Sequence, residues 1–333
     1  MEEIINVSGK MIPHVSPHLE IWGTEIALYL FFGGLAAGII FFANFFYLKG
    51  KEDTMPMTVK VAPMIAPIII ILGLMLLVYD LHHWMYFWQL FLHVRMESPM
   101  SWGAWTLSLI LIPSILWPIH YLNDIIEYLQ NRNPKCKITG ILIWANNLIK
   151  KLPVLPWVLR IFENNRRLIA YLTIYLAVIL GVYTGILLSA FNARPLWNSS
   201  ILGPLFLTSG VSTAAALIMW LSNDPTERKM YSKIDLFLIA VELFFIIHLF
   251  MGMLSSGVAQ VEAAQLFLGG PFTATFWVLI VGMGLIVPAI LEILELSGFH
   301  IPIGIPAFLI LLGGLLFRFV MIYAGQESGF HIL

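Results

Sequence analysis

The chain has 333 residues, of which 59% are hydrophobic and only 11% are charged, and its net charge at pH 7 is −1. Soluble domains carry roughly 25% charged residues, so this composition, with a mean hydropathy of +0.88, excludes an ordinary soluble enzyme. The small net charge excludes a field that would attract nucleic acid. The one cysteine, Cys136, excludes an internal disulfide and a cysteine-ligated iron–sulfur cluster, which needs about four such ligands.

Apolar runs long enough to cross a bilayer occupy most of the chain, since a spanning helix needs about 20 apolar residues. Only helices and closed barrels satisfy their backbone in lipid, and these runs are too long for barrel strands. The sequence therefore predicts an all-α integral membrane protein with about eight transmembrane helices. The predicted spans are 22–48, 61–84, 101–128, 168–190, 203–222, 232–255, 272–296 and 303–324. Residues 22–324 form the predicted transmembrane domain, between an N-terminal segment (1–21) and a C-terminal tail (325–333).

Basic residues gather in the connections that follow the odd-numbered spans, at 49–60, 132–167 and 228–233. Loops rich in Lys and Arg stay in the cytoplasm, so both termini are predicted to be periplasmic, in the inner (cytoplasmic) membrane of the cell. The long loop at about 130–166 is expected to lie in the cytoplasmic interface. Its apolar stretches would enter the headgroup region, and its basic residues would reach anionic lipid.

Polar side chains from several spans are expected to collect in the outer third of the membrane. An ionisable group is costly in lipid, so each is a functional candidate. In chain order they are Glu25, Tyr29, Asp80, His82, His83, Tyr183, Ser209, Ser212, Thr213 and His248. This distribution suits a quinone, because Tyr and His can donate to its carbonyls while Glu and Asp can accept the protons of a quinol. The alternative is structural, with Tyr29 as an interfacial anchor and His248 as a packing residue.

A second group of charges lies deeper. Glu242 in the sixth span and Arg318 in the eighth are expected near mid-membrane as a buried pair and part of a proton path. Four further groups near the cytoplasmic ends would form either a proton route or structural pairs: His120, Asp124, Glu292 and Glu295.

No nucleotide fingerprint and no metal-spaced Cys/His cluster is present, so no metal site and no redox group of its own is predicted. Two rival functions remain open. A secondary transporter or ion-coupled permease would use the same charges, although its helices are usually broken. A b-type cytochrome anchor would hold haem between His82 or His83 and His248.

Several blocks resemble one family, in matching order and spacing. They are Tyr29–Gly38, Tyr79–Leu81, Ser98–Trp105 (Ser-Pro-Met-Ser-Trp-Gly-Ala-Trp), Tyr183–Ser189, Arg194–Asn198 (Arg-Pro-Leu-Trp-Asn), and Arg318 with Ala324–Gln326. The chain resembles the NrfD/PsrC family, the integral membrane quinone-binding subunits of polysulfide reductase and related respiratory complexes. The resemblance covers most of the chain.

The resemblance implies eight core helices in two four-helix bundles and a menaquinone or ubiquinone pocket near the periplasmic face. It implies no haem or iron–sulfur cluster in this chain, a periplasmic ferredoxin-like iron–sulfur partner and, through that partner, a catalytic molybdenum or multihaem subunit. Such a membrane protein reacts with quinol but is not catalytically complete alone.

Site residues follow from the same resemblance. Tyr183 is similar to the family's quinone-binding tyrosine, and Tyr29 stands where a close relative has a quinone-binding histidine. Asp80 and Arg318 resemble the family's aspartate and arginine in the second and eighth spans. The expected catalytic residues are Glu25, Asp80 and Tyr183; the expected cofactor contacts are Tyr29, Asp80, Trp105, Tyr183, Asn198 and His248; the expected proton path uses Glu242 and Arg318.

Overall fold

The computed structural model of the protein describes residues 22–81, 84–92, 95, 97–132, 137–151 and 153–329. Within this part of the chain, all regular structure is helical. Eight helical segments are long and apolar enough to cross a membrane, which confirms the predicted all-helical membrane architecture. They are α1 (Thr24–Leu48), η1 to α2 (Met57–Asp80), α4 (Pro99–His120), α8 (Arg166–Ser189), α9 (Leu202–Leu221), α10 (Pro225–Leu254), η4 to α12 (Thr275–Leu296) and α13 (Gly304–Glu327).

Two predicted span boundaries are wrong. The third span, expected to reach residue 128, ends at His120, because Tyr121 leaves the helical conformation. The sixth span, expected from residue 232, already begins at Pro225. Asp224 caps it there by accepting a 3.0 Å hydrogen bond from the backbone N–H of Thr226, so α10 begins outside the apolar run.

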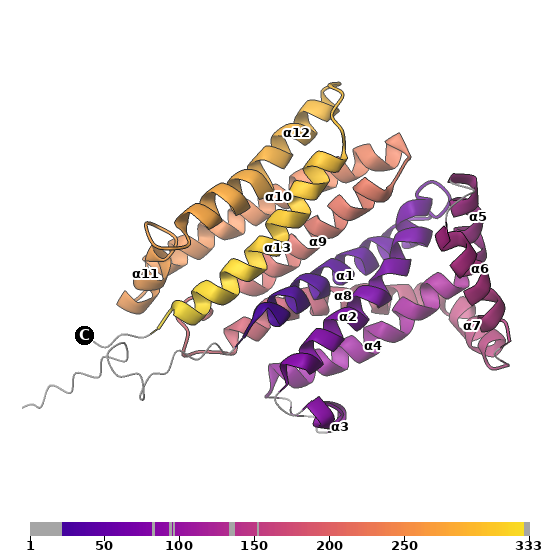
Figure 1. Cartoon of the computed structure of the whole chain (residues 1–333), viewed down its shortest axis with the longest axis horizontal. Coiled ribbons are helices and arrows are strands. Elements are labelled where there is room, and N and C mark those ends of the chain that lie inside the picture. Colours follow the sequence, from indigo (N-terminus) through magenta and orange to yellow (C-terminus); the bar gives the residue numbers. More distant parts are fainter. Residues whose placement is uncertain are drawn as a thin grey trace, which may run out of the picture.

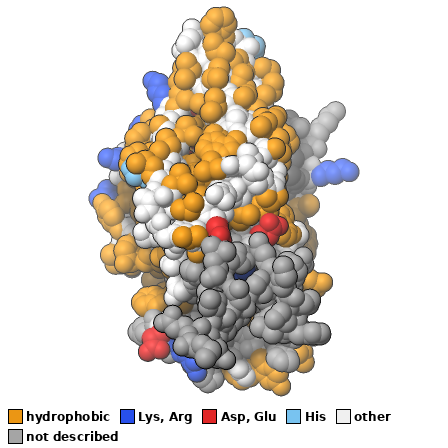
Figure 2. Space-filling view, turned by 90° about the vertical axis from the view of Figure 1, so that its left-hand side faces the viewer, with side chains coloured by type: hydrophobic (Ala, Val, Ile, Leu, Met, Phe, Trp, Pro, Cys, Tyr) orange, Lys and Arg blue, Asp and Glu red, His pale blue; other side chains and the backbone are white. Residues whose placement is uncertain are grey.

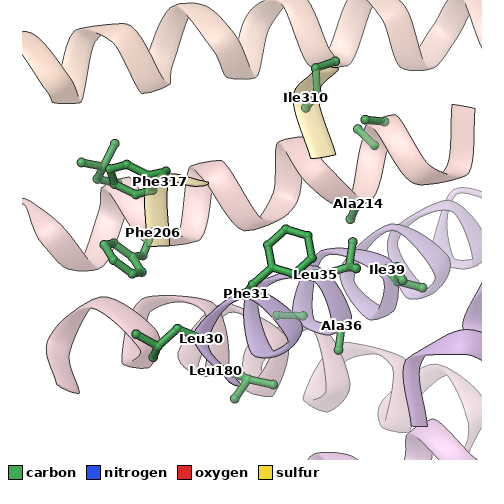
Figure 3. Packing of buried hydrophobic residues seen from close by; sticks show 14 of the residues in the cluster. Leu30, Phe31, Leu35, Ala36, Ile39, Leu180, Phe206, Ala214, Ile310 and Phe317 are labelled. Carbon is green, nitrogen blue, oxygen red and sulfur yellow. The ribbon is translucent and has the colours of Figure 1, made fainter. Parts of the chain in front are cut away.

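The spans form two four-helix bundles, as the resemblance implied (Figure 1). The first bundle contains α1, α2, α4 and α8, and the second contains α9, α10, α13 and the η4–α12 helix. Helix α1 lies at the centre of the molecule, since it packs on α2 and α8 in its own bundle and on α9 and α13 in the other. In Figure 3, Leu35 and Ala36 of α1 lie between Leu180 of α8 and Ala214 of α9.

Small residues let the two bundles approach closely. The Cα of Gly34 lies 2.8 Å from where a Cβ on Gly210 would stand, and a Cβ on Gly38 would lie 2.5 Å from the Cβ of Ala214. Small residues are common where membrane helices pack tightly. The Gly34–Gly38 pattern is therefore explained by the contact between α1 and α9.

The connection between α4 and α8, which includes the loop at about 130–166, contains short helices that extend beyond one end of the first bundle (Figure 1): α5 (Leu122–Arg132), α6 (Lys137–Ile149) and α7 (Leu155–Asn164). Large apolar side chains stand exposed on α6 and α7, among them Ile141, Trp144, Trp157 and Ile161. Exposed apolar surface also dominates the described residues in Figure 2, as is usual for a lipid-facing surface. The interfacial position of α6 and α7 remains a prediction.

The N-terminal end of α1 and the C-terminal end of α13 are joined by hydrogen bonds. The backbone N–H of Trp22 donates to Gln326 Oε1 at 3.0 Å, and Gln326 Nε2 donates to the carbonyl of Trp22 at 2.8 Å. Arg194 donates to the carbonyls of Gln326 and Ser328, and the buried Trp197 Nε1 donates to the carbonyl of Met321 at 2.8 Å. Much of the Arg-Pro-Leu-Trp-Asn block therefore has a structural role. The first and last described residues also lie at the same end of the bundles, as eight crossings require.

Two further short helices and one helical turn lie at the same outer end: η3 (Trp84–Tyr86), α3 (Gln89–Leu92) and α11 (Val258–Gln265). The first two connect α2 to α4, and α11 follows α10.

Candidate functional site

A pair of buried tyrosines lies inside the first bundle. Tyr29 of α1 and Tyr183 of α8 are only 2% and 6% exposed, and their phenols lie close to each other. The ring of Tyr29 lies against Gly73 of α2, and the ring of Tyr183 lies against Gly103 of α4. All four helices of the first bundle therefore meet at the pair.

The two glycines differ in how much space they provide. A Cβ on Gly103 would lie 2.1 Å from Cζ and 2.2 Å from the hydroxyl oxygen of Tyr183, so no larger residue fits while that ring stays in place. A Cβ on Gly73 would lie 3.5 Å from Cδ2 of Tyr29, an ordinary contact distance. The Trp-Gly-Ala-Trp block thus contains the glycine on which the phenol of Tyr183 depends.

Both candidate carboxylates of the outer site lie beyond the tyrosine pair. Glu25 and Asp80 are each half-buried. Glu25 precedes Tyr29 by one turn of α1, and Asp80, the last residue of α2, follows Gly73 by about two turns, or about 10 Å along the helix axis. The directions of α1 and α2 place both carboxylates toward the end of the bundle at which the described chain begins; that this end faces the periplasm remains a prediction. Their role in proton transfer remains a prediction.

Other predicted contact residues are exposed. Trp105 is 40% exposed and lies two positions after Gly103, on the other side of α4. Asn198 is exposed in the α8–α9 connection. His248 is exposed on α10 of the second bundle, where Nδ1 makes a 2.8 Å hydrogen bond to the carbonyl of Phe244. These three residues are not gathered around the tyrosine pair, and their contact with a ligand remains a prediction.

The histidines proposed for haem, His82 and His83, lie outside the described residues. The structure therefore leaves the cytochrome alternative untested.

A second polar cluster lies where the two bundles meet. Arg318 of α13 is fully buried and donates to Ser209 Oγ, to the carbonyl of Gly314 at 3.0 Å and to the carbonyl of Phe206 at 3.1 Å. The rings of Phe206 and Phe317 lie 5.2 and 5.3 Å from its guanidinium carbon, within cation–π range.

Glu242 of α10, which is 3% exposed, approaches the same serine. Ser209 lies close to Glu242 while it accepts from Arg318. Glu242 and Arg318 do not form one of the ion pairs found among the described residues. The two groups nevertheless interact electrostatically, and their role as a pair in a proton path remains a prediction. Ser209, expected in the outer pocket, belongs to this cluster instead.

Asp235 is a buried carboxylate that is absent from the candidates predicted from the sequence. It lies on α10, fully buried, and its Oδ1 accepts a 2.7 Å hydrogen bond from Ser212 Oγ. The predicted sixth span begins at residue 232, which places Asp235 in its first turn, near the polar end of the helix. The sequence does contain a pattern that indicates Asp235, because Asp235 and Glu242 are seven residues apart and share one helix face.

Comparison with known proteins agrees with the blocks identified in the sequence. The family described as "Polysulphide reductase, NrfD" matches residues 13–328. The chain is 32% identical over 323 residues to "Protein NrfD" of Escherichia coli (strain K12), covering 92% of this chain and 95% of that protein. It is 31% identical over 320 residues to one of the chains of the polysulfide reductase of Wolinella succinogenes, covering 92% and 94%. A subunit of the selenate reductase of Mesobacillus selenatarsenatis is 22% identical over 316 residues, covering 90% and 73%.

Proposed function

Because this chain belongs to the NrfD/polysulfide reductase family, whose members include membrane subunits of reductase complexes, we propose that it is the quinol-reactive membrane anchor of such a complex. It binds menaquinol or ubiquinol near the periplasmic face and exchanges electrons with an iron–sulfur partner subunit. The observation that supports this proposal most directly is the Tyr29–Tyr183 pair, buried where four helices meet.

The donor set at this pair fits a quinone. Two phenol hydroxyls held next to each other in an apolar bundle supply hydrogen-bond donors for ring carbonyls, and the helices around them are apolar enough to accept an isoprenoid tail. When bound, a quinol would supply the two-electron, two-proton redox chemistry.

The chain's own residues orient and deprotonate this ligand. Tyr29 and Tyr183 would hold the ring oxygens, giving up their mutual contact to do so. Glu25 and Asp80, nearer the outer end, would accept the released protons as general bases and pass them to the periplasm. The sequence equally allows the reverse direction, quinone reduction.

The partner would dock on the outer side, in the orientation proposed for an inner membrane protein with periplasmic termini. Basic residues cluster in the opposite loops, which favours this orientation. A protein with a single cysteine must pass electrons to clusters held elsewhere, in a ferredoxin-like subunit. A catalytic molybdenum or multihaem subunit would follow, and this chain alone would turn over no terminal substrate.

Replacing Tyr183 by phenylalanine is expected to weaken binding of a fluorescent quinol-site inhibitor to the purified protein about tenfold, because one hydrogen bond of about 1 to 1.5 kcal/mol is lost. Asp80→Asn should weaken it as well. Fluorescence titration in detergent measures both. Tyr175→Phe is the matched control, since Tyr175 lies on the same helix but is 66% exposed.

The outcomes separate the hypotheses. Saturable binding unchanged by Tyr183→Phe and Asp80→Asn would leave the quinone function and reject this site. No binding by the folded wild type, even with its iron–sulfur partner present, would favour the transporter alternative.

A second function, proton translocation, is favoured by the Glu242–Ser209–Arg318 cluster, because buried charges inside membrane bundles commonly mark proton relays. In proteoliposomes that contain the assembled complex, Glu242→Gln is expected to abolish charge movement during quinone turnover while electron transfer continues. A pH-sensitive dye would follow proton movement across the membrane, and a potential-sensitive dye would follow the movement of charge. Undiminished charge movement in this variant would exclude Glu242 from the path.

A further inference from the structure

Two buried carboxyl groups face each other in the second bundle, one helix turn or more away from the residues used above. Asp235 lies on α10 and Glu292 on α12, and both are fully buried. Their carboxyl groups are within hydrogen-bonding reach of each other. Neither residue contributes to the tyrosine pair or to the binding of Arg318.

Three of the four carboxyl oxygens in this pair have no hydrogen-bond donor among the described residues. Ser212 donates to Oδ1 of Asp235, but no donor among the described residues reaches Oδ2 of Asp235 or either oxygen of Glu292. An ionised carboxylate can only accept hydrogen bonds. Two ionised groups in this arrangement would therefore leave three buried acceptors unsatisfied, although a hydrogen at the contact would satisfy two of them.

The electrostatics lead to the same conclusion. A single unpaired carboxylate is costly to bury, and two like charges at hydrogen-bonding distance cannot both ionise in a dry site. We propose that Asp235 and Glu292 hold one proton between them and form a proton-binding site in the second bundle. One carboxylic acid donates its O–H to the carboxylate of the other, so the pair carries one negative charge and two buried acceptors are satisfied.

Charged groups on the surrounding helices favour this state. Glu242 lies on the same face of α10, toward Arg318 of α13, and Glu295 lies on α12 on the other side of the pair. Both neighbours of the pair are acidic, so a second negative charge on the pair would be repelled from two directions. From α9, only the hydroxyl of Ser212 reaches Asp235 among the described residues.

Glu295 connects the pair to the inner end of the bundle. It is only half-buried, and it interacts electrostatically with basic groups at that end, namely Arg228, Lys229 and His300. The pair would therefore exchange its proton with the cytoplasm through Glu295. This direction rests on the orientation given under the proposed function, whereas the shared proton does not.

The helix that carries Glu292 has an unusual backbone. The 12 residues of η4 (Thr275–Ile286) form a π-helix directly before α12, and π-helical segments of any length are rare and frequent at functional sites. A π turn contains more residues than an α turn, so it changes the direction in which later side chains point. Gly284 of η4 packs directly on Gly313 of α13, and this contact holds the two helices tightly together.

Infrared difference spectroscopy of the purified full-length protein in lipid nanodiscs tests the proposal without any quinone. At neutral pH, the wild type is expected to show a protonated-carboxyl stretch that shifts in D₂O. This band should move or disappear in Asp235→Asn and in Glu292→Gln, and it should be lost in the double variant. Glu262→Gln, a substitution of the partly exposed carboxylate on α11, should leave it unchanged.

Absence of the band in folded wild type, or a band left unchanged by either single substitution, would overturn the shared proton. The amide variants nearly preserve side-chain shape, and thermal unfolding of each variant verifies its fold. Since the spectrum requires no quinone, this result is independent of the inhibitor titration, and either proposal can fail without the other.

Discussion

Replacing Gly103 by valine is expected to weaken binding of the quinol-site inhibitor by roughly 100-fold. A Cβ at this position would lie 2.2 Å from the hydroxyl oxygen of Tyr183, so the phenol would have to leave its position beside Tyr29. Overpacking of this kind costs about 1–3 kcal/mol, and the upper end corresponds to about two powers of ten in affinity. The effect should exceed that of Tyr183→Phe, which removes one hydroxyl and leaves the ring in place.

Gly252→Val is the matched control, because a Cβ on Gly252 of α10 meets no atom within 4 Å. Gly73→Ala should have little effect, since its added carbon would stand at ordinary contact distance from Tyr29. Titration of all three variants, with thermal unfolding to verify the fold, separates local displacement from general damage. Equal binding by Gly103→Val and Gly252→Val would show that the inhibitor does not depend on the position of Tyr183.

Replacing Arg318 by leucine is expected to destabilise the protein by about 3–5 kcal/mol, the usual cost of removing one partner of a buried charge pair. The substitution leaves Glu242 buried without a nearby cation, and it removes the donor to the carbonyls of Phe206 and Gly314. The midpoint of unfolding in a mixed-detergent titration, followed by tryptophan fluorescence, measures the change. Arg318→Lys should be milder because it retains the charge.

The double variant Glu242→Gln/Arg318→Leu decides whether the two charges are coupled. Since glutamine carries no charge, the double variant should recover part of the stability that Arg318→Leu loses. Coupled residues deviate from additivity by about 0.5–3 kcal/mol. Strictly additive losses would contradict an electrostatic link through Ser209.

The architecture is largely predictable from the sequence, because lipid imposes a simple rule on it. Each span has to be a long apolar helix, so the eight spans and the all-helical fold follow from hydropathy alone. The largest errors occur at the end of α4, where Tyr121 leaves the helical conformation, and at the start of α10, where the Asp224 cap decides the boundary. Local backbone chemistry, which a hydropathy window averages out, controls these positions.

The site is only partly predictable, because hydropathy gives depth but not direction around a helix. Depth and the family resemblance both indicate Tyr29 and Tyr183, and the structure brings them together. Trp105 and His248 have similar depth to other candidates but face outward. Gly103 and Asp235 are missing from the predicted site. Gly103 matters because it has no side chain where the phenol of Tyr183 lies, and Asp235 matters because of Glu292 on a helix distant in sequence. Neither property is visible in a single span.

The central position of α1 has a consequence for biosynthesis. This helix leaves the ribosome before the other seven described spans, and its neighbours α8, α9 and α13 are translated later. The newly inserted α1 must therefore remain soluble in lipid without its partners, and its side chains suit that stage. Its one amide, Asn44, donates from Nδ2 to the carbonyl of Ile40 at 2.8 Å, a partner within the same helix. Closure of the molecule around α1 thus waits until α13 has been translated.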